Sequence, residues 1–215
     1  MLSIMENINE KRCECGKIHS FTSKVYSGKG AIEKLGGTLK EFETKKAFVF
    51  ADINTAKVGM DAVLNILNAN GIKYTSFVFS NSPKPDERAV GSVAMHCPQD
   101  SDTVIAIGSG VINDIGKMLV ALGGKKYVII ATAPSMDGYA SNSSSMCRDG
   151  LKVSLSSKSA DAIIGDTDIL KTAPVKMFAS GLGDMLAKYV SLCEWEISNI
   201  ITGEYYCKTI ADLTS

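Results

Sequence analysis

The chain has 215 residues, of which 45% are hydrophobic and 21% are charged, and its 23 basic residues balance its 23 acidic ones. This composition is typical of a soluble globular protein of one or one and a half domains, and it excludes a disordered or fibrous chain. The zero net charge gives no reason to expect nucleic acid or an anionic membrane as a partner. No apolar stretch is long enough to span a bilayer, and the N-terminus has no apolar core followed by a small-residue cleavage site, so no secretory signal is expected. Because the six cysteines are scattered along the chain, we expect a reduced, cytoplasmic protein.

Short apolar runs alternate with helical patterns along most of the chain. Residues 47–51, for example, are uniformly apolar, as expected of a strand that is covered on both faces. This alternation predicts a parallel sheet with right-handed crossovers. A β-hairpin is predicted at residues 145–156, with its turn at Asp149 and Gly150. In chain order, strands are predicted at residues 22–27, 47–51, 74–79, 103–107, 126–131 and 161–170, and helices at 31–42, 55–69, 86–96, 111–122 and 174–202.

The pattern changes twice along the chain and therefore predicts three parts. We expect a leader at residues 1–20, an α/β domain at residues 21–172 and, at residues 173–215, the first helices of an incomplete helical C-terminal domain. The last residues end within a helical pattern and carry no cap. This ending predicts that the chain is part of a longer protein.

A glycine turn follows the strand predicted at residues 103–107. Residues 108–117 read GSGVINDIGK, which is a turn followed by the start of a helix. Glycines let a ligand approach the backbone, and the free N–H groups of a helix N-terminus favour a phosphate group. The spacing does not fit a Walker A loop, and Asn113 stands where the common dinucleotide fingerprint has its third glycine. The alternative is an ordinary tight turn, because a glycine pair alone is a weak signal.

Two aspartates stand where a binding role competes with a local structural one. Asp52 follows the strand at 47–51, so it is placed either to hydrogen-bond a ribose or to cap the helix that begins near Asn54. Asp184 follows two glycines within a predicted helix, each of which costs about 1 kcal/mol relative to alanine, so another group must approach that backbone or the helix must start there. An acid at such a point is a reasonable metal ligand, and the alternative is an ion pair between Asp184 and Lys188.

Three segments together resemble the superfamily of iron-type alcohol dehydrogenases and dehydroquinate synthases. Residues 108–117 match its GGGxxxDxxK pattern, with serine as the middle residue of the glycine triplet. Residues 131–141 (ATAPSMDGYAS) are similar to the TAPSxDGxAS segment of sn-glycerol-1-phosphate dehydrogenases, and residues 180–189 (SGLGDMLAKY) resemble the (A/S)GxGDxxAK segment of the same family. The second segment is the specific one, because glycerol dehydrogenases and dehydroquinate synthases share the other two more loosely. The resemblance runs from about residue 20 to the end of the chain.

This resemblance implies an α/β fold in which a parallel-sheet nucleotide-binding domain is followed by the start of an all-α metal-binding domain. It implies NAD(H) or NADP(H) and one divalent metal ion, zinc or nickel, as cofactors. Asp137 and Asp184 would bind the substrate, and Asp184 would also bind the metal. The residues implied to bind the dinucleotide are Asp52, Gly110, Val111, Ile112, Asn113, Asp114, Thr132, Ala133, Pro134, Ser135 and Ser141.

The implied activity is the reversible reduction of dihydroxyacetone phosphate to sn-glycerol 1-phosphate, a step of phospholipid biosynthesis, by a homo-oligomer of the full-length protein. The metal would polarise the ketone oxygen and the dinucleotide would supply the hydride. The chain offers no residue that we identify as a general acid. The alternatives are a glycerol dehydrogenase-like polyol oxidoreductase, a dehydroquinate synthase-like lyase and a non-catalytic nucleotide-binding module. The TAPSxDG segment argues against the first two.

The chain holds two histidines, and neither corresponds to a metal ligand of the superfamily, whose histidine ligands lie on later helices. His19 is in the leader and His96 is near the end of a predicted helix, so this segment alone is expected to be inactive. Cys13, Cys15 and His19 offer three zinc ligands. Their spacing is not that of a standard zinc finger, and no fourth ligand lies nearby in the sequence. The role of the leader stays open.

Overall fold

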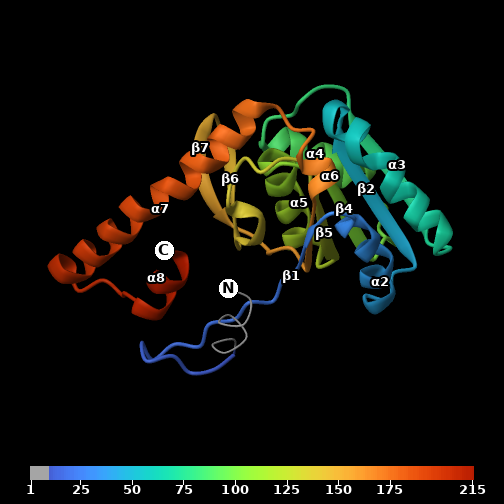
Figure 1. Cartoon of the computed structure of the whole chain (residues 1–215). Coiled ribbons are helices and arrows are strands. Elements are labelled where there is room, and N and C mark those ends of the chain that lie inside the picture. The colour runs from blue at the N-terminus through green and yellow to red at the C-terminus, as the bar shows by residue number, and fades with distance from the viewer. Residues whose placement is uncertain (1–9) are drawn as a thin grey trace.

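The computed structural model describes residues 10–215, so residues 1–9 of the predicted leader lie outside the described part. Figure 1 shows a sheet with helices on both faces and one long helix that leaves it. The six strands of the sheet are all parallel, in the order β1-β8-β5-β4-β2-β3, which confirms the predicted parallel sheet. They are β1 (Lys24–Gly28), β2 (Lys46–Asp52), β3 (Lys73–Phe79), β4 (Thr103–Gly108), β5 (Lys126–Ala131) and β8 (Ala162–Asp166).

The helices follow the predicted pattern, with one correction. The segment at 161–170, predicted as a single strand, divides into β8 and the short helix α6 (Thr167–Leu170). The carboxylate of Asp166 accepts a hydrogen bond of 2.9 Å from the N–H of Asp168, and this cap starts the helix. The other helices are η1 (Ala31–Glu33), α2 (Lys34–Glu41), α3 (Ile53–Ala69), α4 (Glu87–His96), α5 (Gly110–Gly123), η2 (Gly138–Ala140), α7 (Val175–Thr202) and α8 (Lys208–Thr214).

The sheet has an apolar core on each face. Successive side chains of a strand point to opposite faces, so Val49 of β2 packs with α2 and α3, whereas Phe48 and Phe50 pack with α4 and α5. Every residue of β4 is buried, as expected of a central strand that helices cover on both sides. The helical side chains that complete the two cores include Leu35, Leu39, Val63 and Leu67 on one face, and Ala89, Val93, Ile112, Ile115 and Leu119 on the other.

The predicted β-hairpin is confirmed. Strands β6 (Ser143–Arg148) and β7 (Leu151–Ser156) pair in antiparallel fashion. Asp149 and Gly150 form the turn with φ of 52° and 80°, and two successive positive φ angles are typical of the tight turn that matches strand twist. The hairpin lies outside the large sheet and packs beside α5.

The longest helix, α7, extends away from the sheet, and α8 folds back from its far end toward the leader (Figure 1). Pro174, the first residue of the helix predicted at 174–202, is the N-cap of α7, and the helix itself begins at Val175. Within α7 only Gly181 is buried. Across residues 10–215, no helix combines the length and the apolar character that crossing a membrane requires. Large apolar side chains exposed along α7 are Val175, Met177, Phe178, Leu182, Met185, Leu186, Tyr189, Val190, Ile197, Ile200 and Ile201.

Candidate functional site

A cleft of about 420 Å³ opens at the carboxyl ends of β2 and β4. The chain crosses from β2 to β3 on one side and from β4 to β5 on the other, so the cleft lies where the strand order reverses. Open α/β sheets bind their ligands at this point, and the volume is that of a small-molecule site. Of the residues predicted to bind the dinucleotide, those that line the cleft are Asp52, Val111, Ile112, Thr132 and Ala133.

Asp52 ends β2 and is the N-cap of α3. One of its carboxylate oxygens, Oδ1, accepts hydrogen bonds from the N–H groups of Asn54 at 2.7 Å and Thr55 at 3.0 Å. The Thr55 hydroxyl accepts in return from the N–H of Asp52 at 3.1 Å, which completes a capping box. The predicted capping role is therefore confirmed. Because these bonds use Oδ1, and because Asp52 also lines the cleft, the second oxygen remains for a ligand.

The N-terminus of α5 borders the same cleft. Ser109 is the N-cap of α5 and lines the cleft, and its side chain makes no capping hydrogen bond. The N–H groups of a helix's first turn have no partner inside the helix, and they favour a negatively charged group. This end of the 14-residue helix is therefore suited to a phosphate.

The two glycines of the turn, Gly108 and Gly110, differ in whether the surrounding protein leaves room for a side chain. A Cβ atom on Gly108 would stand 2.3 Å from the Cβ of Ile112, so packing alone excludes a larger residue there. A Cβ atom on Gly110 would meet only Met136, at an ordinary contact distance of 3.5 Å. The backbone of Gly110 is also outside the left-handed region. The contacts inside the protein therefore give no reason for glycine at position 110. Gly110 does not itself line the cleft, but its neighbours Ser109 and Val111 do.

Lys117 is buried and fastens the loop after β5 to α5. Its side chain is 1% exposed and forms an ion pair of 3.0 Å with Asp114. Its Nζ donates to Ser141 Oγ at 3.0 Å and to the carbonyl oxygens of Gly138 at 3.3 Å and Ser143 at 2.5 Å. Burial raises the pKa of Asp114, and the neighbouring Lys117 ammonium opposes that rise. The side chains of Asp114 and Ser141, both predicted to bind the dinucleotide, thus hold the loop in place.

Asn113 has a similar structural role. Its side chain is fully buried, its amide nitrogen donates to the Gly138 carbonyl oxygen at 3.3 Å, and its amide oxygen accepts from the Tyr127 hydroxyl at 3.1 Å. Its backbone N–H donates to the Ser109 carbonyl oxygen at 2.9 Å. The asparagine in place of a third glycine therefore ties the start of α5 to β5 and to the loop at Gly138.

The loop at residues 132–136 lies against α7. A Cβ atom on Gly181 would stand 2.0 Å from the carbonyl oxygen of Pro134, whereas a Cβ atom on Gly183 would have no atom within 4 Å. The glycine pair was expected to allow another group to approach the helix backbone. That approach occurs at Gly181, and the approaching group is the backbone of Pro134. The predicted cofactor residues Pro134 and Ser135 form this contact with α7 and do not line the cleft.

Three charged residues connect the same loop to α7. The backbone N–H of Asp137 donates to Oδ2 of Asp184 at 2.9 Å, and the carboxylate of Asp137 forms an ion pair with Lys188. Burial raises the pKa of Asp137, but the hydrogen bond and charge of Lys188, together with the hydrogen bond involving Asp184, lower the pKa overall. The pairing of Asp184 with Lys188, considered as the alternative to metal binding, is therefore wrong, because Lys188 pairs with Asp137.

A catalytic metal ordinarily keeps three protein ligands, and the resemblance implies one of them at Asp184. Within residues 10–215, metal-ligating side chains gather in a group of three or more at only one place, and it excludes Asp184. That place joins the leader to the start of α8 and consists of Cys13, Cys15, His19 and Cys207, hereafter the cysteine–histidine cluster. The sequence near the leader offers no fourth ligand, and the structure supplies one from a distant position, Cys207. No local pattern reveals it, because only the fold brings position 207 to the leader.

Comparisons with known proteins agree with the family resemblance of the sequence. A family model described as iron-containing alcohol dehydrogenase matches residues 26–174. A glycerol-1-phosphate dehydrogenase (NAD(P)+) of Halalkalibacterium halodurans is 31% identical over 208 residues, which are 94% of this chain and 52% of that protein. The enzyme of the same name from Bacillus subtilis is 33% identical over 187 residues, covering 85% of this chain and 48% of its own length. The chain therefore spans about half the length of the curated relatives it matches.

Solved structures agree on the fold. A glycerol dehydrogenase of Schizosaccharomyces pombe has a TM-score of 0.74 at 25% identity, over 85% of this chain and 46% of its own. A 1,3-propanediol oxidoreductase has a TM-score of 0.70 at 19% identity, over 78% of this chain and 50% of its own, and shares the fold alone. The matched family model covers most of the sheet and every residue that lines the cleft except Met177. The chain belongs to the iron-containing alcohol dehydrogenase family.

Proposed function

We propose that this chain is the dinucleotide-binding half of an enzyme that reversibly reduces dihydroxyacetone phosphate to sn-glycerol 1-phosphate. The observation that carries the proposal is the cleft at the reversal of strand order, bordered by Asp52 and by the uncapped N-terminus of α5. The names of the relatives at 31% and 33% identity support the choice of substrate. The TAPSxDG segment, which resembles that family specifically, supports it further.

Each part of the cleft suits one part of a dinucleotide. The pyrophosphate would lie against the first turn of α5, where Gly110 leaves room and the backbone N–H groups donate. The free oxygen of Asp52 would accept a hydrogen bond from the adenosine ribose. Thr132 and Ala133 would border the remainder, with the Ala133 carbonyl oxygen held by the Tyr139 hydroxyl at 2.7 Å. When bound, NADH or NADPH supplies the hydride.

Asp137 and Asp184 would bind the substrate, with Asp184 also serving as one ligand of a zinc or nickel ion. The bond from the Asp137 N–H occupies one lone pair of Asp184 and orients the carboxylate, which keeps its other oxygen for a ligand. The remaining metal ligands do not come from the described residues, so we derive no catalytic step through the metal.

The two roles of Asp52 are separable by substitution. Asp52→Ala should lower the free energy of unfolding by about 1 kcal/mol, because the cap is lost, whereas Asp52→Asn should keep the cap and the stability. Asp52→Asn should also raise the affinity for NADPH relative to that for NADH, because a neutral amide no longer repels the 2′-phosphate. Urea unfolding and titration of both dinucleotides by their fluorescence measure these effects. If Asp52→Asn leaves both affinities unchanged, Asp52 is a cap alone.

Asp184 is best tested in a protein of the relatives' length that carries this segment. Asp184→Asn should lower metal content and turnover of dihydroxyacetone phosphate together, because an amide oxygen carries no charge for a divalent ion. The amide can still accept from the Asp137 N–H, so the free energy of unfolding should change by less than about 1 kcal/mol. Elemental analysis beside activity measures both. A variant that keeps its metal and its rate would remove Asp184 from the site, and faster turnover of unphosphorylated dihydroxyacetone by the parent would favour a glycerol dehydrogenase.

A further inference from the structure

The leader forms a tight turn that presents two cysteines and a histidine together. The N–H of Cys13 donates to the Lys17 carbonyl oxygen at 2.9 Å, and the N–H of Gly16 donates to the Cys13 carbonyl oxygen at 2.9 Å. Gly16 has a φ of 83°, a conformation that suits glycine, and it allows the chain to reverse within four residues. As a result Cys15 Sγ lies 3.4 Å from Nε2 of His19, although neither residue lies in a strand or helix.

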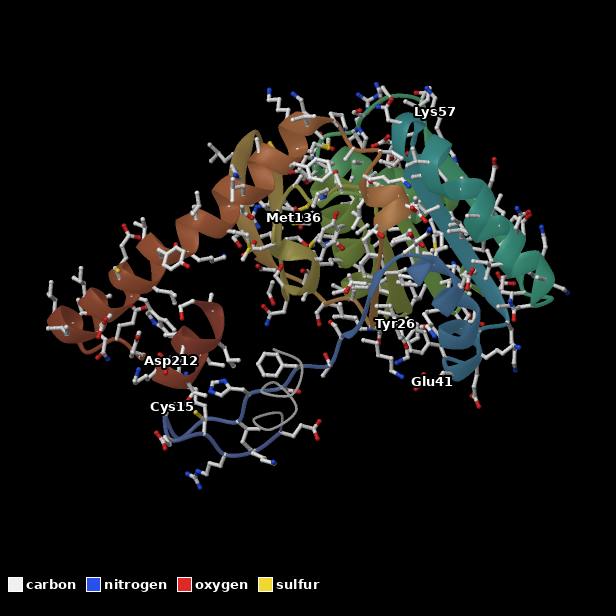
Figure 2. All side chains as sticks on the ribbon, viewed as in Figure 1. Cys15, Tyr26, Glu41, Lys57, Met136 and Asp212 are labelled. Atoms are coloured by element: carbon white, nitrogen blue, oxygen red, sulfur yellow. The ribbon has the colours of Figure 1, made fainter. Side chains whose placement is uncertain are left out.

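The fourth side chain comes from the segment between α7 and α8. Gly203 ends α7 in the left-handed conformation, and the chain then turns back so that Cys207, the N-cap of α8, is buried against the leader. Cys207 Sγ lies 3.6 Å from Cys13 Sγ and 3.4 Å from Nε2 of His19. In Figure 2 the leader, labelled at Cys15, lies next to α8, labelled at Asp212.

We propose that the leader and the segment before α8 together bind one structural zinc ion through Cys13, Cys15, His19 and Cys207. Tetrahedral zinc with its usual bond lengths sets sulfur atoms about 3.8 Å apart, and sulfur and nitrogen about 3.6 Å apart. The four ligand atoms here all lie within 4.8 Å of one another, and the closest pairs are separated by 3.4 to 3.6 Å. The cluster therefore needs only small adjustments to enclose the ion.

The ligand set identifies both the metal and its role. Three sulfurs and one imidazole nitrogen in a tetrahedral arrangement are typical of zinc. Four protein ligands leave no open position for substrate or water, so the site is structural and not catalytic. It shares no residue with the cleft, and it goes beyond the proposed dehydrogenase activity.

The surroundings of the cluster orient the ligands further. The Tyr205 hydroxyl lies 3.1 Å from Cys15 Sγ, and the Thr209 hydroxyl lies 3.4 Å from Cys13 Sγ. The Lys17 ammonium stands 3.5 Å from the centre of the Tyr205 ring. Hydrogen-bonding groups around the ligands commonly hold them in position, and a nearby cation offsets the net negative charge of three thiolates and one zinc ion.

A disulfide is the main competitor, because Cys13 and Cys207 are neighbours. Their sulfurs are 3.6 Å apart, well beyond the roughly 2.05 Å of a disulfide bond. A disulfide would also leave Cys15 and His19 without a shared role. A thiol titration after removal of the metal distinguishes the two states. The zinc site leaves every cysteine thiol free to react, whereas a disulfide removes two thiols from the count.

The first test is the metal content of the purified 215-residue chain. Elemental analysis should find one zinc per chain, and exchange for Co(II) should give the visible absorption of tetrahedral cobalt with thiolate charge-transfer bands. Cys207→Ser should lose both signals, whereas Cys193→Ser, at an exposed cysteine of α7, should keep them. Asp184→Asn should also keep them, which separates this site from the metal proposed for catalysis. A zinc-free parent chain without a cobalt signal, or a Cys207→Ser variant that keeps its zinc, overturns the proposal.

A second test guards against variants that fail to fold. His19→Cys should retain zinc because sulfur replaces nitrogen as a ligand, whereas His19→Ala should lose it. In the parent chain, chelation of the metal should speed tryptic cleavage after Arg12 and Lys17, which are exposed on the leader. Cleavage that is indifferent to the chelator, or a Cys13–Cys207 disulfide found by mass spectrometry in place of zinc, contradicts the site.

Discussion

Gly110→Val is expected to lower the affinity of the chain for NADH by about tenfold or more while leaving its thermal midpoint nearly unchanged. A side chain at position 110 would stand at the first turn of α5, where the pyrophosphate needs close contact with backbone N–H groups. The fold should tolerate the change, because the new Cβ would meet only the flexible Met136 side chain at 3.5 Å. Fluorescence titration with NADH and a thermal melt measure the two quantities on one sample.

Gly91→Val is the matched control for that experiment. Gly91 lies within α4, and a Cβ atom there would have no atom within 4 Å. The control makes the same substitution in a helix away from the cleft, so it should keep the NADH affinity. Equal affinities for the parent chain and Gly110→Val would place the pyrophosphate elsewhere and remove the main support for the proposed cofactor site.

Gly181→Ala should destabilise the chain by about 1 to 3 kcal/mol, even though alanine is the better helix former. The new Cβ would stand 2.0 Å from the Pro134 carbonyl oxygen, so either the loop or α7 has to move. That movement would also lengthen the bond between the Asp137 N–H and Asp184. Urea unfolding followed by circular dichroism gives the change in the free energy of unfolding.

The second glycine of the pair supplies the control. Gly183→Ala introduces the same methyl group two residues away, where no atom lies within 4 Å. It should therefore stabilise the chain by up to about 1 kcal/mol through helix propensity alone. If the two variants have the same stability, the contact between α7 and Pro134 does not hold in solution.

The fold was largely predictable because its signals are local. Each strand of the large sheet is a short apolar run, and Gly71 and Gly124 end helices in the left-handed conformation as their positions in the sequence indicate. The boundary at Asp166 was not predictable from periodicity, because Ile163 and Ile169 continue one apolar pattern across a strand and a helix. A side-chain cap, and not hydrophobicity, decides where that strand ends.

The candidate site was predictable in position but less so in detail. The glycine turn and Asp52 indicated the edge of the sheet where the cleft lies. The use of Lys117 and Asn113 to hold the loop depends on side-chain directions that a single sequence does not contain. Cys207 is further out of reach, because 188 residues separate it from His19 and only the return of α8 brings them together.

The length of α7 means that a small change in its angle near the cleft produces a large displacement near the cysteine–histidine cluster. Its 28 residues extend about 42 Å, from Val175, close to the cleft-lining Met177, to the turn that precedes α8. The contact between Gly181 and Pro134 is the point at which α7 packs on the loop, and about 32 Å of helix lies beyond it. A tilt of about 5° there would displace the far end by about 3 Å. The leader continues into β1 of the sheet and contacts that far end at Cys207, so it connects the sheet to the end of α7 that lies farthest from Gly181.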